Sequence, residues 1–458
     1  MSTLEGVRES APYRTPHETL YGYCWCRAPA VAPVPTLKSV CYEVLVRDAR
    51  SLCRLLPSVP DCFAAPLLAR AVEDGRDRAA QLLVSVWPDD SLDLQSVLET
   101  NCPLGQHPCR LAAVAAIVRS FVEMSLSAEV SSRLHRLDVT GFQCGRELIE
   151  FIARKMTVYS KRRPLDRGGR SLRCDFLVGE AHTFDAFCAV LRHDRRALRV
   201  DVANLEVEGI GELRLSELLD TLEAEPVVGL SVAYNSLQNQ GLLHVCERLR
   251  RFRGLVALDV SSNGVRRGDV HHYDSLADTL RALPRLRRLS LKSCRIGGYL
   301  NTLVSRCYRQ IDHLDVSACG LRRQDLRVLE HFEDLQSLVL SDNNLSSLIH
   351  ELAAVLLALG RLRVLLLSNC DLRSEGFDVV WDALKSSGNE LRWLDLTWNR
   401  LSEEKLTEVV ADLVTGGCLP RLVNLLVPVP SNPSPRYFEA VKRVEEASPR
   451  LRVHTDLV

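Results

Sequence analysis

Cysteines and strand-borne carboxylates are the side chains of this sequence whose type and spacing could do chemistry. The chain holds 16 cysteines. Cys24 and Cys26 are spaced too closely for a zinc knuckle and have no second pair nearby, so we expect no metal there. Cys294, Cys319 and Cys370 recur at one position of a repeat. That placement is typical of small buried side chains in a reducing compartment, and it argues against disulfides.

Carboxylates recur within short L-D-V or L-D-L stretches at Asp259, Asp315 and Asp395. On a strand the middle residue points away from its leucine neighbours, so these groups could contact a ligand as charges or could simply be solvated. A catalytic pair is not indicated. The sequence has no Gly-rich phosphate loop, nucleophile elbow or H-E-x-x-H zinc motif. We therefore expect no enzyme, no metal and no cofactor.

These cysteines and carboxylates lie within a sequence repeat, which fixes their positions in the fold. The pattern L-x-x-L-x-L-x-x-N/C-x-L begins at residues 227, 255, 286, 311, 335, 362 and 391, and an eighth copy from 422 loses it at Pro428. The starts lie about 28 residues apart, which is typical of leucine-rich repeats. The central L-x-L predicts a short strand, and parallel pairing of such strands requires a crossover helix. The Asn or Cys at position 9 is expected to satisfy backbone groups of the turn.

The stretches between these strands have helical periodicity, as in 275–283, 376–387 and 403–414. We therefore predict an α/β fold: a ribonuclease-inhibitor-like leucine-rich-repeat solenoid, a parallel-sheet horseshoe with an N-terminal helical cap. Segments 134–142, 171–179 and 197–207 are interpreted as degenerate first repeats. We predict four regions: a disordered Pro-rich lead-in at 1–33, a helical region at 34–130, the solenoid at 131–430 and a C-terminal cap at 431–458.

Charge and hydropathy narrow the class of function. Lys plus Arg equals Asp plus Glu, at 58 each, which argues against a nucleic-acid or membrane-surface binder. No apolar run reaches the roughly 18 residues of a membrane span, and the N-terminus lacks the apolar core of a signal peptide. We expect a cytoplasmic protein, and the basic stretch 160–173 could serve as a nuclear address.

The N-terminal third begins with a helical pattern from Thr36, in which Leu37, Val40, Cys41, Val44 and Leu45 share one face. Thr36 is a suitable N-cap. The stretch TLKSVCYEVL, residues 36–45, resembles an elongin C-binding BC box. The alternative interpretation, which involves no partner, is a first core helix that caps the solenoid.

A second motif follows about twenty residues later. The stretch VPDCFAAPL, residues 59–67, resembles a cullin-2 box, and Leu56-Pro57 is a rival start that places Pro60 at an apolar contact. From about residue 36 onward the chain resembles the family of the preferentially expressed antigen of melanoma (PRAME) and its leucine-rich-repeat-containing sister proteins. The resemblance rests on both boxes, the repeat array and the closing stretch VPVPSNPSPRYFEAVKRVE.

Members of that family resemble substrate receptors of cullin-2–elongin B/C ubiquitin ligases. The resemblance implies that elongin C is contacted by Leu37, Cys41 and Leu45, and cullin-2 by Val59, Pro60, Phe63 and Leu67. The target protein would bind the concave face of the solenoid, through solvent-facing strand residues: Arg287, Arg288, His313, Gln336, Trp393 and Trp398. The alternative is a cytosolic scaffold, or a signalling or transcription regulator, that binds proteins without a ligase. An enzyme or GTPase activator on the same fold has little support.

Overall fold

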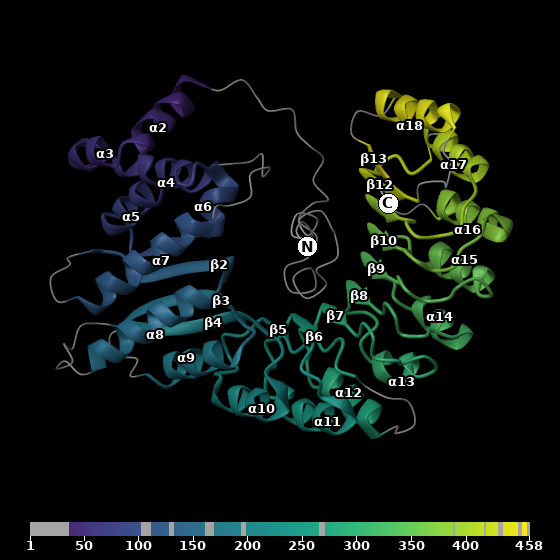
Figure 1. Ribbon diagram of the computed structural model, residues 1–458, viewed down its shortest axis with the longest axis horizontal. Coiled ribbons are helices and arrows are strands. Elements are labelled where there is room, and N and C mark those ends of the chain that lie inside the picture. The colour runs from purple at the N-terminus through teal and green to yellow at the C-terminus, as the bar shows by residue number, and fades with distance from the viewer. Residues whose placement is uncertain are drawn as a thin grey trace, which may run out of the picture. The chain divides into compact units, whose positions relative to one another are not determined.

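The computed structural model describes residues 36–101, 111–127, 132–160, 169–193, 198–264, 271–387, 390–415, 418–428, 434–447 and 451–455. The predicted lead-in 1–33, with Cys24 and Cys26, lies outside these residues, as does most of the basic stretch 160–173. The described chain forms two compact units, one that ends at Val228 and a second from Gly229 to Val458. Figure 1 labels the elements of both units.

The first unit opens with helices and continues as alternating strands and helices. Its elements are α2 (Leu37–Arg47), α3 (Ala49–Leu55), η2 (Leu56–Ser58), η3 (Asp61–Phe63), α4 (Ala64–Glu73), α5 (Asp77–Ser85), β1 (Ser91–Asp93), α6 (Leu94–Asn101), α7 (Leu111–Leu126), β2 (Arg136–Cys144), α8 (Arg146–Ser160), β3 (Arg170–Val178), α9 (Ala181–Arg192), β4 (Leu198–Val207) and α10 (Gly211–Thr221). Strand β1 pairs in parallel with β2. The sheet therefore starts inside the region that the sequence suggested was only helical.

Strands β2 to β4 are nine or ten residues long, with register shifts between them, and are not short repeat strands. Asp175 on β3 joins all three. Its carboxylate accepts hydrogen bonds from the backbone N–H of Gly141 at 2.7 Å and from the N–H and side-chain amide of Asn204 at 3.0 and 2.9 Å. The buried charge is thus held by three donors, which compensates for its loss of water.

The second unit repeats a strand and a helix along its whole length. Its elements are β5 (Gly229–Ser231), α11 (Gln238–Leu249), β6 (Ala257–Asp259), α12 (His271–Arg281), β7 (Arg288–Ser290), α13 (Leu300–Val304), β8 (His313–Asp315), α14 (Arg323–Leu329), β9 (Ser337–Val339), α15 (Ile349–Ala358), β10 (Val364–Leu366), α16 (Ser374–Ser386), β11 (Trp393–Asp395), α17 (Glu403–Thr415), β12 (Asn424–Val427), α18 (Pro435–Ala447) and β13 (Arg452–Thr455).

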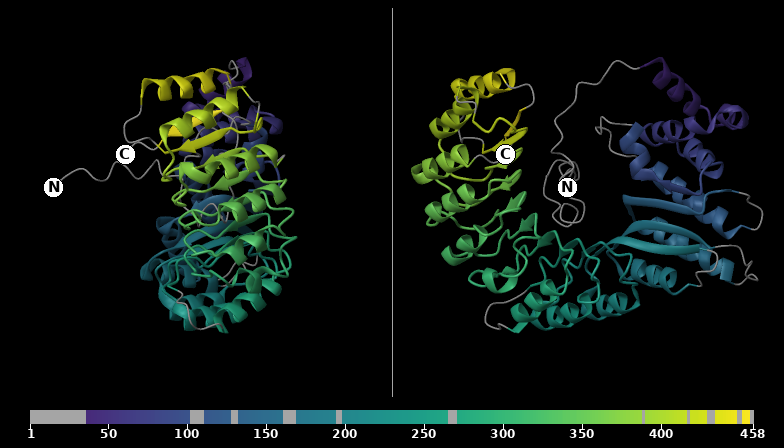
Figure 2. Two further views of the ribbon diagram at one scale, coloured as in Figure 1. Left: turned by 90° about the vertical axis from the view of Figure 1, so that its right-hand side faces the viewer. Right: turned by 180° about the vertical axis from the view of Figure 1, so that it is seen from behind.

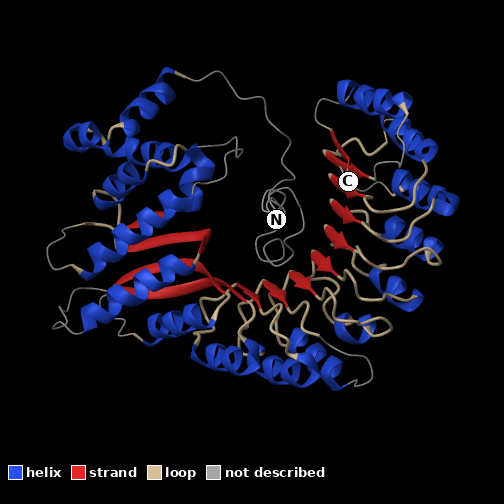
Figure 3. Cartoon of the chain, in the orientation of Figure 1, coloured by secondary structure: helices blue, strands red, loops and turns tan. Residues whose placement is uncertain are grey.

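Within this unit the strands lie on one side and the helices on the other (Figure 3). The helices follow one another side by side in chain order (Figure 2). Every strand from β5 to β13 pairs in parallel with its neighbour in the sequence. The predicted leucine-rich-repeat solenoid is confirmed. The predicted cap helix is α18, and it is followed by a further strand, β13, that the sequence did not indicate.

The repeat leucines form one continuous column in the core of the second unit. The leucine at position 4 of each copy is the register partner of the next, from Leu230 on β5 through Leu365 on β10 to Leu425 on β12. All of them are fully buried. Each such leucine contributes about 1.5–3 kcal/mol relative to exposure, and a single repeat could not bury its own.

Position 9 closes the turn after each strand, as its residue type suggested. The side-chain amide of Asn343 donates to the carbonyls of Leu340 at 2.8 Å and of Val316, in the preceding repeat, at 3.0 Å. Its side-chain oxygen accepts from the N–H groups of Cys319 and Leu321 at 3.1 and 3.2 Å. One asparagine therefore satisfies buried backbone groups of two repeats.

Cysteine does part of the same task where it replaces asparagine. The thiol of Cys319 donates to the carbonyl of Leu291 at 3.0 Å, and that of Cys370 to the carbonyl of Leu340 at 3.4 Å. Burial raises the pKa of both thiols to about 12, so they remain protonated donors at neutral pH. A thiol is a weaker donor than an amide.

We expect Asn343→Ala to lower the free energy of unfolding by about 2–4 kcal/mol, because it leaves buried carbonyl and N–H groups of two turns without partners. Urea denaturation followed by circular dichroism measures this loss. The neighbouring Asn344 is exposed, so Asn344→Ala is the control and should cost less than about 1 kcal/mol. Equal losses in both variants would contradict the assigned role.

Position 8 has a left-handed backbone in each of the seven copies. The residues with φ between +53° and +60° there are Tyr234, Ser262, Ser293, Ala318, Asp342, Asn369 and Trp398. A non-glycine residue in this region is strained by about 1–3 kcal/mol. This backbone conformation turns the chain so that the side chain at position 9 reaches the backbone groups at the ends of the strands. The hydrogen bonds made there compensate for the strain.

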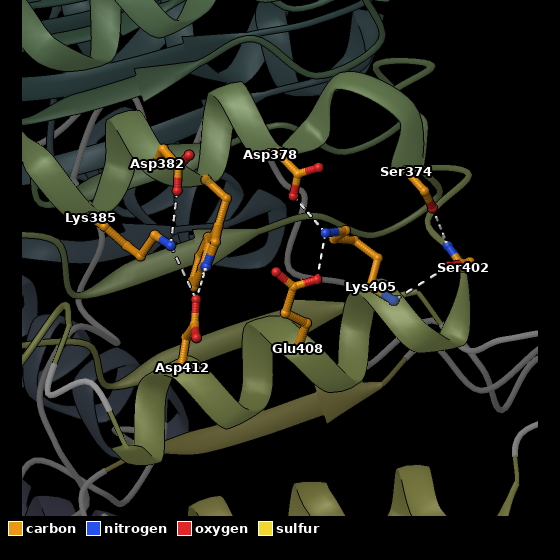
Figure 4. A network of polar contacts seen from close by, with 9 residues as sticks. Ser374, Asp378, Asp382, Lys385, Ser402, Lys405, Glu408 and Asp412 are labelled. Atoms are coloured by element: carbon orange, nitrogen blue, oxygen red, sulfur yellow. Dashed lines mark hydrogen bonds and ion pairs between the residues drawn. The ribbon is translucent and has the colours of Figure 1, made fainter.

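On the helix side, ion pairs join neighbouring repeats, as Figure 4 shows for α16 and α17. Lys405 contacts Asp378 of the preceding helix and Glu408 of its own, each at 2.5 Å. The indole N–H of Trp381 donates to Asp412 at 2.8 Å. That hydrogen bond is the main reason why the pKa of Asp412 is lowered. These charges are matched within the protein and hold two helices together.

Candidate partner-binding surfaces

The first candidate surface is an exposed apolar stripe on helix α2. The Thr36 hydroxyl accepts a hydrogen bond from the N–H of Ser39 at 3.1 Å, so the predicted N-cap is confirmed. Leu37, Val40, Cys41 and Val44, at spacing i, i+3, i+4 and i+7, are all exposed; Leu37 is 82% and Val44 60% exposed. We call these four residues the α2 stripe.

The α2 stripe differs in one respect from the predicted contact set. Leu37 and Cys41 lie on it, but Leu45 is half-buried against the rest of the unit. Val40 and Val44 belong to the stripe although the BC-box pattern does not name them. Helical periodicity already placed these five residues on one face of the helix. The structure shows that four of them are exposed and that Leu45, at the edge of the face, is half-buried.

Helix α2 is fixed to the first unit by its opposite side. Val46 is buried, and the guanidinium of Arg70, on α4, lies 3.4 Å from the carboxylate of Glu43. The same guanidinium donates to Asp74 at 3.0 Å. Because the Glu43–Arg70 pair is partly buried and Arg70 is itself held by Asp74, the pair helps to keep α2 in one orientation with its stripe outward.

The second box-like segment is only partly accessible. Pro60 is exposed and Val59 is half-buried. The Phe63 ring packs edge-on against Tyr42 of α2, with centroids 6.2 Å apart, and the Lys38 ammonium lies 5.5 Å from the Phe63 centroid. Phe63 thus ties this segment to the helix that bears the α2 stripe.

Leu67 requires a correction to its predicted role. It lies inside α4 and is 1% exposed, so it is a core residue of the helical region. The apolar position that the cullin-2-box pattern assigns to a partner contact is filled here by intramolecular packing. The accessible part of the segment ends before α4, and Pro60 belongs to that part in either register.

The strand residues predicted to face a target protein divide into two groups. Arg287 and Trp398 are exposed, Trp398 at 64%, and Arg288 and Gln336 are half-buried. His313 and Trp393 are buried, which corrects the expectation that they are open to solvent. Burial, together with the charge of Arg288, lowers the pKa of His313 to about 3, so it is neutral.

Trp393 is buried within an apolar cluster that the repeat pattern did not predict. The cluster joins positions 3 and 5 of four neighbouring strands, β9 to β12, and consists of Val339, Val364, Leu366, Trp393 and Leu426. The signal was present in the sequence, because five of these eight positions are large apolar residues on β9 to β12, whereas none is on β5 to β8.

The carboxylates of Asp259, Asp315 and Asp395 are neither solvated nor offered to a ligand. All three are buried, and each accepts a hydrogen bond from the backbone N–H two residues later, at 2.8–2.9 Å. In Asp315 and Asp395 the same oxygen also accepts from the hydroxyl of that residue at 2.6 Å. They are structural caps of the strand ends. Both readings of these residues from sequence were wrong.

Burial raises the pKa of Asp259 to about 6, from an ordinary value of 3.8. The folded state therefore keeps a proton that the unfolded chain releases between about pH 4 and 6, and stability falls as the pH rises through that range. We expect Asp259→Asn to raise the free energy of unfolding by about 1–3 kcal/mol at pH 7.5, with a smaller gain near pH 4.

Denaturation at the two pH values tests this expectation. Asp185 is exposed on α9, so Asp185→Asn is the control and should change stability by less than about 0.5 kcal/mol at either pH. A loss of stability in Asp259→Asn at pH 7.5 would contradict it.

Other classes of site find no support among the residues that the structure describes. No group of three or more His, Cys, Asp or Glu side chains there could hold a metal ion. Over the same residues, no helix combines the length and apolar character of a membrane span.

The fold and its repeat geometry define a leucine-rich-repeat protein. The chain is similar to leucine-rich repeat-containing protein 14 of Xenopus laevis, with 26% identity over 457 residues, covering 86% of this chain and 87% of that protein. The proteins of the same name from Rattus norvegicus and Homo sapiens are 24% and 25% identical, over 79% of this chain and 81% of theirs. No family model matches the sequence. The similarity agrees with the leucine-rich-repeat part of the resemblance noted above.

Proposed function

We propose that this protein is the substrate-recognition subunit of a cullin-2–elongin B/C ubiquitin ligase, belongs to the PRAME family and carries no catalytic residues of its own. The observation on which the proposal depends is the α2 stripe. A helix that only capped the solenoid would turn its apolar face inward. Here Leu37 and Val44 are more than half exposed, while Glu43 on the opposite side of the helix forms an ion pair with Arg70 of α4.

An exposed i, i+3, i+4, i+7 row fits a groove in a partner, because an amphipathic helix recognises such a groove through these positions. Elongin C is the partner that the BC-box resemblance implies. Pro60 and the half-buried Val59 stand as the cullin-2 contacts, and Phe63 acts by holding them near α2. The proposed compartment is the cytoplasm.

The repeat unit would bind the target protein. The strand positions themselves are largely buried, so the contacts would come from side chains that stay exposed beside the strands: Arg287 and Trp398, an aromatic of the type that anchors interfaces. Its left-handed backbone holds the ring at a turn.

Reconstitution tests the proposal. The full-length chain, co-expressed with elongin B, elongin C and cullin-2, is expected to elute with all three as one complex in size-exclusion chromatography. A chain that folds and captures a target protein but leaves elongin B/C in a separate peak would be a scaffold without a ligase, and the proposal would be wrong.

A further inference from the structure

Three stretches of the repeat unit are rich in arginine and contain no acidic residue. They are residues 248–253, 281–288 and 306–309, which read RLRRFR, RALPRLRR and RCYR. The chain as a whole has no net charge, so ten arginines in these short stretches form a local concentration of positive charge.

The structure brings the three stretches to one edge of the repeat unit. They link α11 to β6, α12 to β7 and α13 to β8, the same connection in three successive repeats. The starts of these strands are direct neighbours: the N–H of Arg287 donates to the carbonyl of Val256, and the N–H of Asp312 to that of Arg287, each at 2.8 Å.

Some of these arginines have a role inside the protein. Arg250 donates to Thr279 at 3.4 Å and to Ser275 at 3.3 Å, across two repeats, and Arg281 pairs with Asp278 of its own helix. Cations at helix C-termini also compensate the helix dipole. These contacts explain the part of the cluster nearest the helices.

Three further arginines also have local surroundings: Arg248 donates to the carbonyl of His244 at 3.0 Å, Arg251 lies 5.1 Å from the Phe252 ring centroid, and Arg288 is half-buried. Five arginines remain, and we call them the arginine edge: Arg253, Arg285, Arg287, Arg306 and Arg309. All five are exposed, and none is ion-paired to a carboxylate of the described chain. The carboxylate of Asp312 lies near Arg287 and is half-buried: burial raises its pKa, and the charges of Arg287 and Arg288 lower it in part. Like charges on neighbouring strands repel each other, so the cluster costs stability unless an anion binds to it.

The arginine edge ends sharply. The corresponding connection of the next repeat carries Glu330, Glu333 and Asp334, and Asp334 forms an ion pair with Arg361. The charge therefore changes sign between adjacent repeats, which sets one boundary of the surface.

We infer that the arginine edge binds an acidic segment of the target polypeptide. Guanidinium groups pair with carboxylates in bidentate fashion, and several of them in a row match a run of Asp and Glu. Three strands cover about 10 Å at the parallel-strand spacing, so an extended segment of about three to four residues would span the edge. The inference rests on the proposed function only in taking the repeat unit as the part that binds the target.

A polypeptide fits this surface better than a nucleic acid does. Proteins that bind single strands combine cations with exposed aromatic rings on which bases stack. The aromatics of these stretches are not available for stacking: Phe252 is fully buried, and Tyr308 packs against Phe332 and His331, with ring centroids 5.3 and 5.6 Å away.

Fluorescence anisotropy with the full-length chain tests the inference. The probe is a labelled octaglutamate peptide, with octaglutamine as the neutral reference and a single-stranded oligonucleotide of equal charge as competitor. We expect octaglutamate to bind, and binding to weaken as salt is added. The triple variant Arg285→Glu, Arg287→Glu, Arg309→Glu should weaken it at least about tenfold.

The matched control carries the same change of charge elsewhere, as Arg78→Glu, Arg327→Glu and Arg436→Glu, three exposed arginines on helices. It should weaken octaglutamate binding less than about twofold, with neither triple variant melting below the parent. Equal weakening in the two variants, no binding to the parent, or tighter binding of the oligonucleotide would overturn the inference. Elongin B/C binding is measured on the same variants. That measurement distinguishes a failure of this inference from a failure of the proposed ligase role.

Discussion

Leu37→Asp is expected to abolish co-purification with elongin B/C, weakening the interaction by at least about a hundredfold. Leu37 is 82% exposed at the start of α2, more than Val40 or Val44 of the α2 stripe. A leucine buried in a partner groove contributes about 1.5–3 kcal/mol, and a carboxylate in its place would have to lose its water without a partner. Pull-down with purified elongin B/C measures the loss.

Folding should be unaffected, because the side chain makes little contact within its own unit. Leu213, on α10, is 85% exposed and provides a control of the same residue type and exposure in the same unit. Leu213→Asp should leave elongin binding and the melting temperature unchanged. If Leu37→Asp binds elongin B/C as well as the parent does, helix α2 is not the docking element and the proposed function loses its support.

The second large effect concerns the leucine column. Leu365→Ala is expected to lower the free energy of unfolding by about 2–5 kcal/mol, because Leu365 is fully buried between Leu338 and Leu394 and a cavity would remain. Since each repeat is stabilised mainly by its neighbours, the loss should also reduce the cooperativity of unfolding across the unit. Urea denaturation monitored by circular dichroism measures both quantities.

Leu357 on α15 supplies the control, since it lies close in the sequence and is 52% exposed. Leu357→Ala should cost less than about 0.5 kcal/mol. A loss below about 1 kcal/mol in Leu365→Ala would mean that the column is not the main source of stability in this unit.

The sequence correctly predicted which candidate residues share a helix face, because local periodicity decides that placement. Leu37 and Cys41 recur one helical turn apart, so any helix over residues 37–47 places them on one face. Prediction from sequence failed at Leu67 and Trp393, because their burial depends on what other elements pack against them. It failed at Asp259 for the same reason: the carboxylate position follows from strand alternation, but its hydrogen bond to a following N–H and its burial do not.

The sequence by itself determined the fold class, the strand positions from residue 229 to residue 427, the turn role of asparagine and cysteine, and the helix that carries the α2 stripe. These features repeat or follow a short period, so each copy of the pattern carries the information needed. Only the tertiary structure decided which apolar and charged side chains remain exposed, where the first strand of the sheet lies, and that arginines from three separate stretches share one edge. Exposure is a property of contacts between segments distant in the chain, and no local period encodes it.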